Sequence, residues 1–254
     1  YQKIRDLVSS GELGKLLRVN WIITRWFRTQ AYYDSGGWRA TWEGEGGGVL
    51  LNQCPHNLDL LQWIVGMPTK IRGFCELGKR HSIEVEDEVT AFMEYPEGCT
   101  GVFVTTTGEA PGTNRLEIAG DQGKLVFEDG EIRYTRNEVP ATEFLQTSPA
   151  SFVRPPVWDV TIPVQGTGRQ HAGILENFAD AILEGKPLIA PAEEGINSVE
   201  MANAMLFSSL KGEPIDLPMD SAAYEAQLKE LIAASTFVKQ SDEQVAGDMG
   251  DSFN

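Results

Sequence analysis

The pattern of apolar and polar positions divides the chain into a helical start, a run of strands and a helical end. Residues 1–10 repeat apolar side chains at helical spacing, and a glycine follows as a stop. Residues 16–29 instead form a β-branched and aromatic run in which Val19, Trp21 and Ile23 share one face. This alternation predicts a strand directly after the first helix.

Short strands are expected through the middle of the chain. Turn residues such as proline, glycine and aspartate separate runs of alternating polarity, and short turns join neighbouring strands in antiparallel order. The expected strands are residues 70–77, 88–95, 99–107, 114–119, 124–128 and 131–135.

In the last third of the chain, apolar residues again recur at helical spacing. One helix is expected from His171 to the glycine at 185, and two more over about 192–210 and 221–234. Strands bracketed by helices predict an α+β domain, with an open, mostly antiparallel β-sheet and helices packed on one face. The other face then needs a cover, which we expect to be a second copy of the chain in a homo-oligomer.

Composition narrows the classes of partner. The 254 residues carry a net charge of -16, and no lysine or arginine cluster reverses this field, so neither nucleic acid nor an anionic membrane is expected to bind. The longest apolar run, residues 49–65, is interrupted by polar residues and falls short of the ~20 residues that cross a bilayer. Three cysteines without C-x-x-C spacing suit a reducing compartment, and a cytoplasmic location is expected.

The usual nucleotide and metal motifs are missing. In "GEGGGV", residues 44–49, valine takes the place of the third small residue, and a tryptophan-rich loop rather than a strand precedes it. His56, His81 and His171 are not at metal-ligand spacing, so no metal is expected. The acidic stretch "EVEDE", residues 84–88, is interpreted as a solvated sheet edge.

A polar stripe interrupts the apolar segment after the glycines. If the chain is helical there, Asn52, His56, Asp59 and Trp63 lie one above another along one face. Pro55 favours a helix that begins at that residue, with an amide side chain capping it. Two interpretations remain open: a capping asparagine with a hydrogen-bonded core histidine, or polar groups that face a cleft.

The run "YYDSGGWRATWEGEGGGVLLNQCPHNLDLLQWIVGMP" carries a resemblance. It joins a Trp-Arg pair, a Gly-Gly-Gly-x-Leu segment, an asparagine, a histidine four residues later, an aspartate three after that, and a Trp-x-x-Gly ending. This pattern resembles the C-terminal domain of the Gfo/Idh/MocA family of NAD(P)-dependent oxidoreductases. The similarity extends to "IRDLVSSGELGKLLRV" near the start and to "HAGILENFADAILEGKPLIAPAEEGINSVEMANAMLFSS" near the end.

The resemblance implies a two-domain enzyme. An N-terminal Rossmann domain would bind most of the NAD or NADP, and this chain would supply the fold of the glyceraldehyde-3-phosphate dehydrogenase C-terminal domain. Residues 1–236 are then expected to form the substrate-binding and oligomerisation domain, residues 1–14 the connecting helix, and residues 237–254 a C-terminal tail. The chain alone is expected to be inactive and to bind NAD weakly or not at all.

The resemblance also implies roles for four residues. His56 matches the family's catalytic histidine, which works with a lysine of the Rossmann domain, and it can exchange a proton with a substrate hydroxyl at neutral pH. Asn52 falls where many members carry aspartate, and its amide can orient an imidazole or hold a hydroxyl but cannot take a proton. Trp38 and Arg39 match the pair that lies beside the nicotinamide half of the cofactor.

Further polar and aromatic residues are candidates for substrate binding, because aromatic faces pack on sugar C–H surfaces and arginines bind hydroxyl or acidic groups. Snorkelling arginines at a strand edge, and a surface position for the histidine, are the alternatives. These candidates are Arg25, Arg28, Tyr32, Tyr33, Trp42 and His171.

The expected reaction is hydride transfer between a secondary alcohol of a sugar, cyclitol or related polyol and NAD(P). Two alternatives share the same residues. Some relatives hydrolyse glycosides through transient oxidation by a tightly held nicotinamide. Others sense a sugar or cofactor without turnover, although a retained histidine at position 56 argues against that interpretation.

Overall fold

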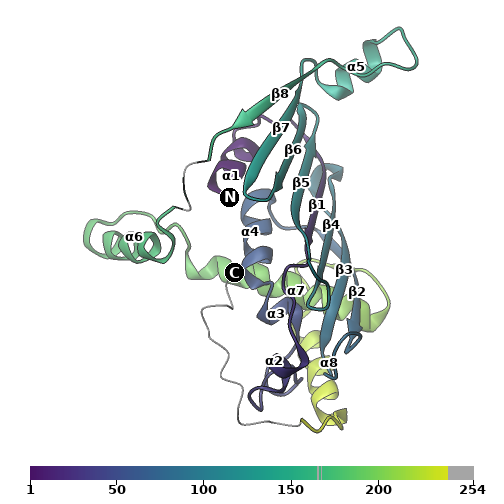
Figure 1. The fold of residues 1–254 in the computed structure, drawn as a ribbon, viewed down its shortest axis with the longest axis vertical. Helices are drawn as coiled ribbons and strands as arrows, with labels where there is room; N and C mark the ends of the chain where they lie inside the picture. Colours follow the sequence, from purple (N-terminus) through teal and green to yellow (C-terminus); the bar gives the residue numbers. More distant parts are fainter. Residues whose placement is uncertain (165, 167, 240–254) are drawn as a thin grey trace.

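A nine-stranded sheet forms the body of the protein (Figure 1). The structure is a computed structural model, and it describes residues 1–164, 166 and 168–239, so most of the predicted tail at 237–254 lies outside the described residues. The strand order is β8-β7-β6-β5-β1-β4-β3-β2-β9. The strands are β1 (Leu16–Ile23), β2 (Lys70–Leu77), β3 (Glu86–Glu94), β4 (Thr100–Thr106), β5 (Asn114–Gly120), β6 (Gly123–Glu128), β7 (Glu131–Asn137), β8 (Val157–Ile162) and β9 (Ile215–Asp216).

The pairing is antiparallel except at the centre of the sheet. There β1 runs parallel to β4 and antiparallel to β5. The remaining neighbours pair antiparallel, as the short turns between them predict. The open, mostly antiparallel α+β fold that the sequence predicts is therefore confirmed.

Helices cover one face of this sheet. In Figure 1, α4 and α7 lie along the sheet, and α1 packs against α4 close to the N-terminus, whereas α5 and α6 project away from the body. None of the helices among the described residues is long and apolar enough to span a bilayer. The helices are α1 (Gln2–Ser9), α2 (Gln30–Asp34), α3 (Val49–Asn52), α4 (Pro55–Val65), α5 (Ala141–Thr147), α6 (Gln170–Glu184), α7 (Gly195–Lys211) and α8 (Ser221–Ala234), with 3₁₀ turns η1 (Pro96–Gly98) and η2 (Ala192–Glu194).

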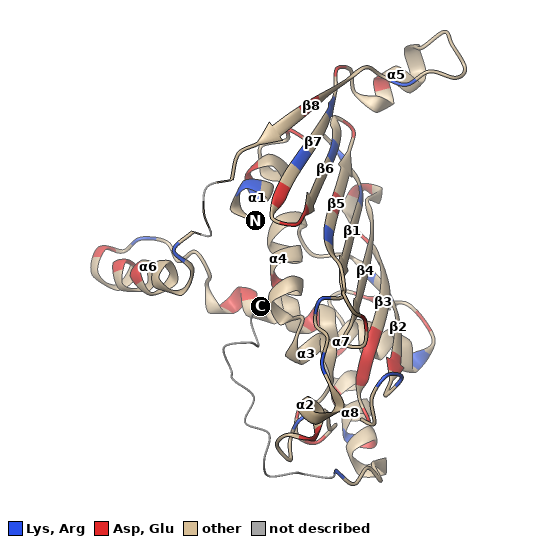
Figure 2. Cartoon of the chain, viewed as in Figure 1, with Lys and Arg blue, Asp and Glu red and all other residues tan. Residues whose placement is uncertain are grey.

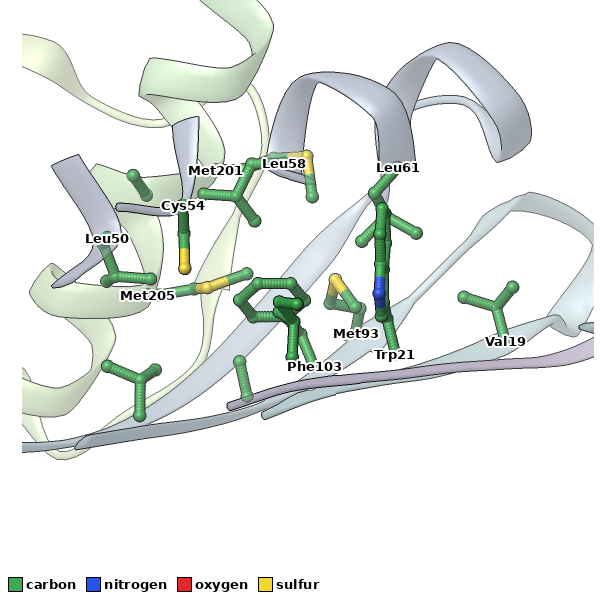
Figure 3. Packing of buried hydrophobic residues seen from close by; sticks show 14 of the residues in the cluster. Val19, Trp21, Leu50, Cys54, Leu58, Leu61, Met93, Phe103, Met201 and Met205 are labelled. Carbon is green, nitrogen blue, oxygen red and sulfur yellow. The ribbon is translucent and has the colours of Figure 1, made fainter. Parts of the chain in front are cut away.

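The core lies between the sheet and these helices (Figure 3). Trp21 and Phe103 rise from β1 and β4 towards Leu58 and Leu61 of α4 and Met205 of α7, and all five are fully buried. The alternation predicted for β1 is confirmed, since Val19, Trp21 and Ile23 are buried. Cys54 is buried as well.

Truncating Phe103 tests this core. Phe103→Ala is expected to lower the free energy of unfolding by about 3–5 kcal/mol, because the lost apolar contacts leave a cavity that the sheet cannot close. The matched control is Phe92→Ala on the neighbouring strand β3, where the side chain is 40% exposed on the opposite face and a loss of less than about 1 kcal/mol is expected. Urea denaturation followed by circular dichroism compares them, and equal losses would contradict the assignment of the core face.

Candidate functional site

The Tyr32 hydroxyl lies at the centre of a hydrogen-bonded network. It accepts hydrogen bonds from Arg39 Nη1 at 2.6 Å and from Gln53 Nε2 at 3.0 Å, and it donates to Asn52 Oδ1 at 2.9 Å. Gln53 Nε2 also donates to Asn52 Oδ1 at 2.7 Å. Four polar side chains, from α2, α3 and the two loops beside them, therefore share one cluster, which we call the Tyr32 network.

The short helix α2 places Tyr32. Thr29 caps this helix, because its side chain accepts the Tyr32 backbone N–H. The next residue, Tyr33, is buried and donates its hydroxyl to Thr107 Oγ1 at 2.8 Å, which anchors the helix to the end of β4. Tyr32 is left half-buried, with its ring at 81° to that of Tyr33. The sequence indicates only an irregular loop here, because a helix of five residues is too short to show a period.

Glu45 joins two parts of the site. One oxygen, Oε2, accepts the Ala40 backbone N–H at 2.7 Å, and the other accepts a hydrogen bond from Asn52 Nδ2. Ala40 is buried and has a positive φ of 55°. Few residues other than glycine, asparagine and aspartate adopt this backbone conformation. The carboxylate thus holds the Trp38–Arg39 pair in register with α3. Glu45 is not singled out by the sequence, and Gln53 is predicted only as an alternative to Asn52 for the cap of α4, a role that the structure gives to neither.

Arg39 is a cation without a carboxylate partner among the described residues. Its guanidinium carbon lies 4.3 Å from the Tyr32 ring centroid and 4.7 Å from that of Trp38, which is half exposed. Its Nε is buried and makes no hydrogen bond. Lys239 donates to the Arg39 carbonyl, and burial together with the Arg39 charge lowers the pKa of Lys239. An aromatic-flanked guanidinium of this kind is suited to a planar or anionic group of a ligand.

Several predicted site residues come together in the structure. Trp38, Arg39, Tyr32 and Asn52 meet in or beside the Tyr32 network, and the Arg28 guanidinium lies 5.2 Å from the Tyr32 ring centroid. These five side chains come from α2, α3 and the loops that flank α2. The sequence alone therefore predicts most of this cluster.

Four other candidates take no part in the hydrogen bonds of the network. Arg25 pairs with Asp129 at 2.7 Å on the surface. Tyr33 and Trp42 are buried in the core and present no exposed face to a ligand. His171 is exposed on α6, which projects away from α2 and α3 in Figure 1.

The predicted polar stripe is divided between two helices. α3 ends at Asn52 and α4 begins at Pro55, with Cys54 as an N-cap that makes no side-chain hydrogen bond, so Asn52 does not cap α4. His56 is exposed and makes no hydrogen bond to any described residue, which corrects the interpretation of a hydrogen-bonded core histidine. Its imidazole, in the first turn of α4, is open to a ligand.

The interpretation of the acidic stretch at 84–88 as a solvated edge is wrong. Glu86 and Asp87 are fully buried. Glu86 Oε1 accepts the backbone N–H groups of Gly48 at 2.8 Å and Leu50 at 3.1 Å, which fixes the start of α3. These backbone donors offset part of the cost of burying Glu86, whose other oxygen, Oε2, is buried without a hydrogen-bond partner, and a sequence pattern does not display such donors.

The pH dependence of stability should reveal Glu86. Burial raises the pKa of Glu86 from 4.5 to about 7, against the opposing effect of its backbone hydrogen bonds. The folded state therefore favours the neutral carboxyl. This stabilisation is complete below about pH 4.5 and is lost as the pH rises to about 7, a change of about 3 kcal/mol at 1.36 kcal/mol per pKa unit.

The Glu86→Gln variant provides the test, because it has no proton to lose. Across this pH range, its free energy of unfolding is expected to gain about 3 kcal/mol relative to the wild type, measured by urea denaturation at a series of pH values. Glu88→Gln is the control of opposite sign, because a hydrogen bond from Lys79 lowers the pKa of Glu88. If the difference in free energy of unfolding between the wild type and Glu86→Gln does not change with pH, the raised pKa of Glu86 is refuted.

Charge is mixed around the site. Figure 2 shows lysine and arginine scattered among acidic residues rather than gathered on one helix or strand. In the part of the chain that the structure describes, no three histidine, cysteine, aspartate or glutamate side chains are grouped so that they could hold a metal ion.

The chain is similar to a known protein family and to a curated protein. Residues 1–126 match the family model described as GFO/IDH/MocA C-terminal domain, which confirms the resemblance predicted from the sequence. A curated relative, the uncharacterized protein y4oX of Sinorhizobium fredii, is 22% identical over 222 residues. The match covers 84% of this chain and 57% of that protein, so the chain spans somewhat more than half of its relative's length.

Solved structures share the fold. The WlbA dehydrogenase from Chromobacterium violaceum, in complex with NADH and UDP-GlcNAcA, matches with a TM-score of 0.69 and 25% identity over 86% of this chain and 59% of that one. A levoglucosan dehydrogenase in complex with NADH and levoglucosan matches with a TM-score of 0.65 and 19% identity over 85% of this chain and 62% of the other. In both comparisons the chain spans about three fifths of the neighbour.

Proposed function

Because residues 1–126 belong to the GFO/IDH/MocA C-terminal domain family, we propose that the chain is the substrate-binding part of a nicotinamide-dependent oxidoreductase. Its substrate would be a sugar, cyclitol or related polyol with a reactive secondary alcohol. The observation that carries the proposal is the Tyr32 network, with the exposed His56 in the first turn of the next helix along the chain, α4. The nucleotide would bind mainly to a domain outside this chain.

One observation at Arg39 and Trp38 indicates that this site could hold a nicotinamide cofactor. Arg39 holds a buried Nε without a hydrogen bond, between the rings of Tyr32 and the half-exposed Trp38. Such a cation can bind a phosphate or carboxamide oxygen, while the tryptophan can cover a flat ring. When bound, the cofactor would accept or supply the hydride. Trp38 and Arg39 would orient it.

Proton transfer would fall to His56. Oxidising an alcohol releases a proton as well as a hydride, and an imidazole open to a ligand can take that proton. Asn52 cannot serve as the base, because its side chain is an amide, and its carbonyl oxygen already accepts from Tyr32 and Gln53. Asn52 would instead hold a substrate hydroxyl in place for His56, through the Nδ2 hydrogen that Glu45 does not accept.

Dehydrogenase neighbours support this chemistry without fixing the substrate. The structures of the WlbA and levoglucosan dehydrogenases hold sugar derivatives together with NADH. The arginines beside the Tyr32 ring, Arg28 and Arg39, would suit a sugar that carries an acidic group.

A homo-oligomer is part of the same proposal. The sheet face that carries no helices exposes Ile22 of β1, Phe92 of β3 and Phe74 of β2. A second copy of the chain would cover these side chains. Light scattering on the purified protein tests this, and a monomeric mass at micromolar concentration would contradict it.

The activity is tested on the complete protein, including any nucleotide-binding domain. Incubation with NAD or NADP and a panel of sugars, sugar acids and cyclitols should yield the reduced cofactor together with a keto product for at least one substrate. Release of a free sugar from a glycoside without net cofactor reduction would instead assign hydrolysis. Cofactor binding without turnover of any compound would assign a sensor.

A further inference from the structure

His81 lies behind the candidate site, in the connection between β2 and β3. Its side chain is only 7% exposed. Nδ1 lies 3.0 Å from Asp87 Oδ2, and Nε2 lies 2.9 Å from the backbone carbonyl oxygen of Arg28. The ring therefore bridges the first residues of β3 and the segment that leads into α2.

Both partners of this ring are hydrogen-bond acceptors. A backbone carbonyl can only accept. The Asp87 carboxylate already accepts the backbone N–H groups of Lys79 at 3.0 Å, Arg80 at 2.8 Å and His81 at 2.9 Å, so it is an acceptor on both oxygens. A neutral imidazole has one N–H and could satisfy only one of the two contacts, leaving a lone pair against a lone pair at the other.

We infer that His81 is a doubly protonated positioning residue, whose imidazolium joins the Asp87 carboxylate to the Arg28 carbonyl and so fixes the segment that carries Tyr32. The charge is matched by Asp87, which is fully buried. This inference concerns the construction of the site and does not rest on the proposed function.

Neighbouring contacts show how the ring acts on the site. Tyr33 packs on the His81 ring, with ring centroids 4.7 Å apart. Ser82, the residue after His81, is joined to Gln30, two residues after Arg28. Gln30 Oε1 accepts the Ser82 backbone N–H at 2.8 Å, and Gln30 Nε2 donates to the Ser82 carbonyl at 3.3 Å. The β2–β3 connection is thus attached to the start of α2 at neighbouring points, and α2 then holds Tyr32 in its network.

The charged and titratable groups around the ring agree with this assignment. Asp87 faces it from β3, Tyr33 and Tyr32 lie on the α2 side, and Arg28 contributes its carbonyl while its guanidinium lies over the rings of Trp26 and Tyr32 at 6.0 and 5.2 Å. A pH high enough to remove one ring proton would open either the Asp87 or the Arg28 contact. Loss of the Arg28 contact would loosen the start of α2.

Nitrogen NMR of the histidine rings tests the protonation state directly on the 254-residue chain. The chain has three histidines, and His56 and His171 are exposed references in the same sample. The His81→Gln variant identifies the His81 signals by their disappearance. At a pH at which the two exposed rings have become neutral, His81 should still show two protonated nitrogens. A single protonated nitrogen on His81 at that pH would overturn the inference.

Positioning is tested by two variants of the same residue. His81→Phe keeps a ring against Tyr33 but removes both N–H donors, and it is expected to shift the side-chain amide resonances of Asn52 and Gln53. His81→Gln retains a donor for the Arg28 carbonyl and should restore most of that shift. The Asn177 amide, which donates to the Pro187 carbonyl beyond α6, is the internal control and should not move. Unchanged Asn52 and Gln53 resonances in a folded His81→Phe protein would refute the positioning role, and if that variant does not fold, the ring measurement on the wild type still decides.

Discussion

Replacing Gly48 by alanine is expected to lower the free energy of unfolding by on the order of 4 kcal/mol. A β-carbon at this position would lie 2.0 Å from the Glu86 carbonyl oxygen and 2.9 Å from Val85 Cγ2. The close neighbour is backbone in β3, which cannot move without disturbing the sheet, so the substitution should cost more than the ~1–3 kcal/mol of ordinary overpacking. Urea denaturation of the purified variant measures the loss.

The neighbouring glycine supplies a matched control. A β-carbon at Gly47 would lie 3.0 Å from Leu51 Cδ1, on a side chain that can turn away, and 3.6 Å from Glu86 Oε1, which is an ordinary van der Waals distance. Gly47→Ala should therefore retain most of the stability. A Gly48→Ala protein as stable as Gly47→Ala would mean that α3 can move away from β3, and that the hydrogen bonds from Gly48 and Leu50 to Glu86 are not a fixed feature.

Replacing His56 by alanine should reduce kcat of the complete enzyme by about 10²–10⁴-fold, the usual contribution of a positioned acid–base group. Affinity for the nicotinamide cofactor should change little, because the ring makes no hydrogen bond to any described residue and its removal leaves the fold intact. Steady-state kinetics and calorimetric titration of the cofactor separate these two effects.

Asp59→Asn on the same helix is the control for His56. Asp59 is exposed one turn further along α4, and it accepts a hydrogen bond only from Gln62, at 3.1 Å, among the described residues. This variant should retain the wild-type kcat. Equal activity of His56→Ala and the wild type would remove His56 from the mechanism, and a parallel loss in Asp59→Asn would indicate damage to α4 rather than a missing base.

The sequence predicts the strands that bury one face. β2 is predicted at its observed bounds, and the predicted β3 to β7 differ from the observed strands by two residues or fewer at each end, because alternating burial imposes a period of two. β8 is missed, because its residues are exposed or half-exposed at the sheet edge and no buried face imposes a pattern. α5 is missed for the same reason, since this short projecting helix buries none of its residues.

The candidate site is predictable only where residue type and local spacing carry the signal. Asn52 stands out by its spacing to His56 in an otherwise apolar segment, whereas Trp38 and Arg39 are found through the Trp-Arg pair of the family resemblance. Glu45 and Gln53 do not, because their role comes from contacts that the fold creates, such as the hydrogen bond from Ala40 to Glu45. The burial of Glu86 is beyond prediction for a related reason: its compensating partners are backbone N–H groups, which every residue except proline possesses.

The central position of β1 has a consequence for how the chain folds. β1 precedes the other strands of this sheet along the chain, yet its two neighbours are β4 and β5, at residues 100–106 and 114–120. The two halves of the sheet therefore cannot be joined until the long intervening chain has been ordered or looped out, and such non-local pairing slows folding. During synthesis, β1 would leave the ribosome with both edges unpaired and with Trp21 and Ile22 uncovered. Uncovered apolar side chains and unpaired strand edges make such an incompletely folded chain prone to aggregation.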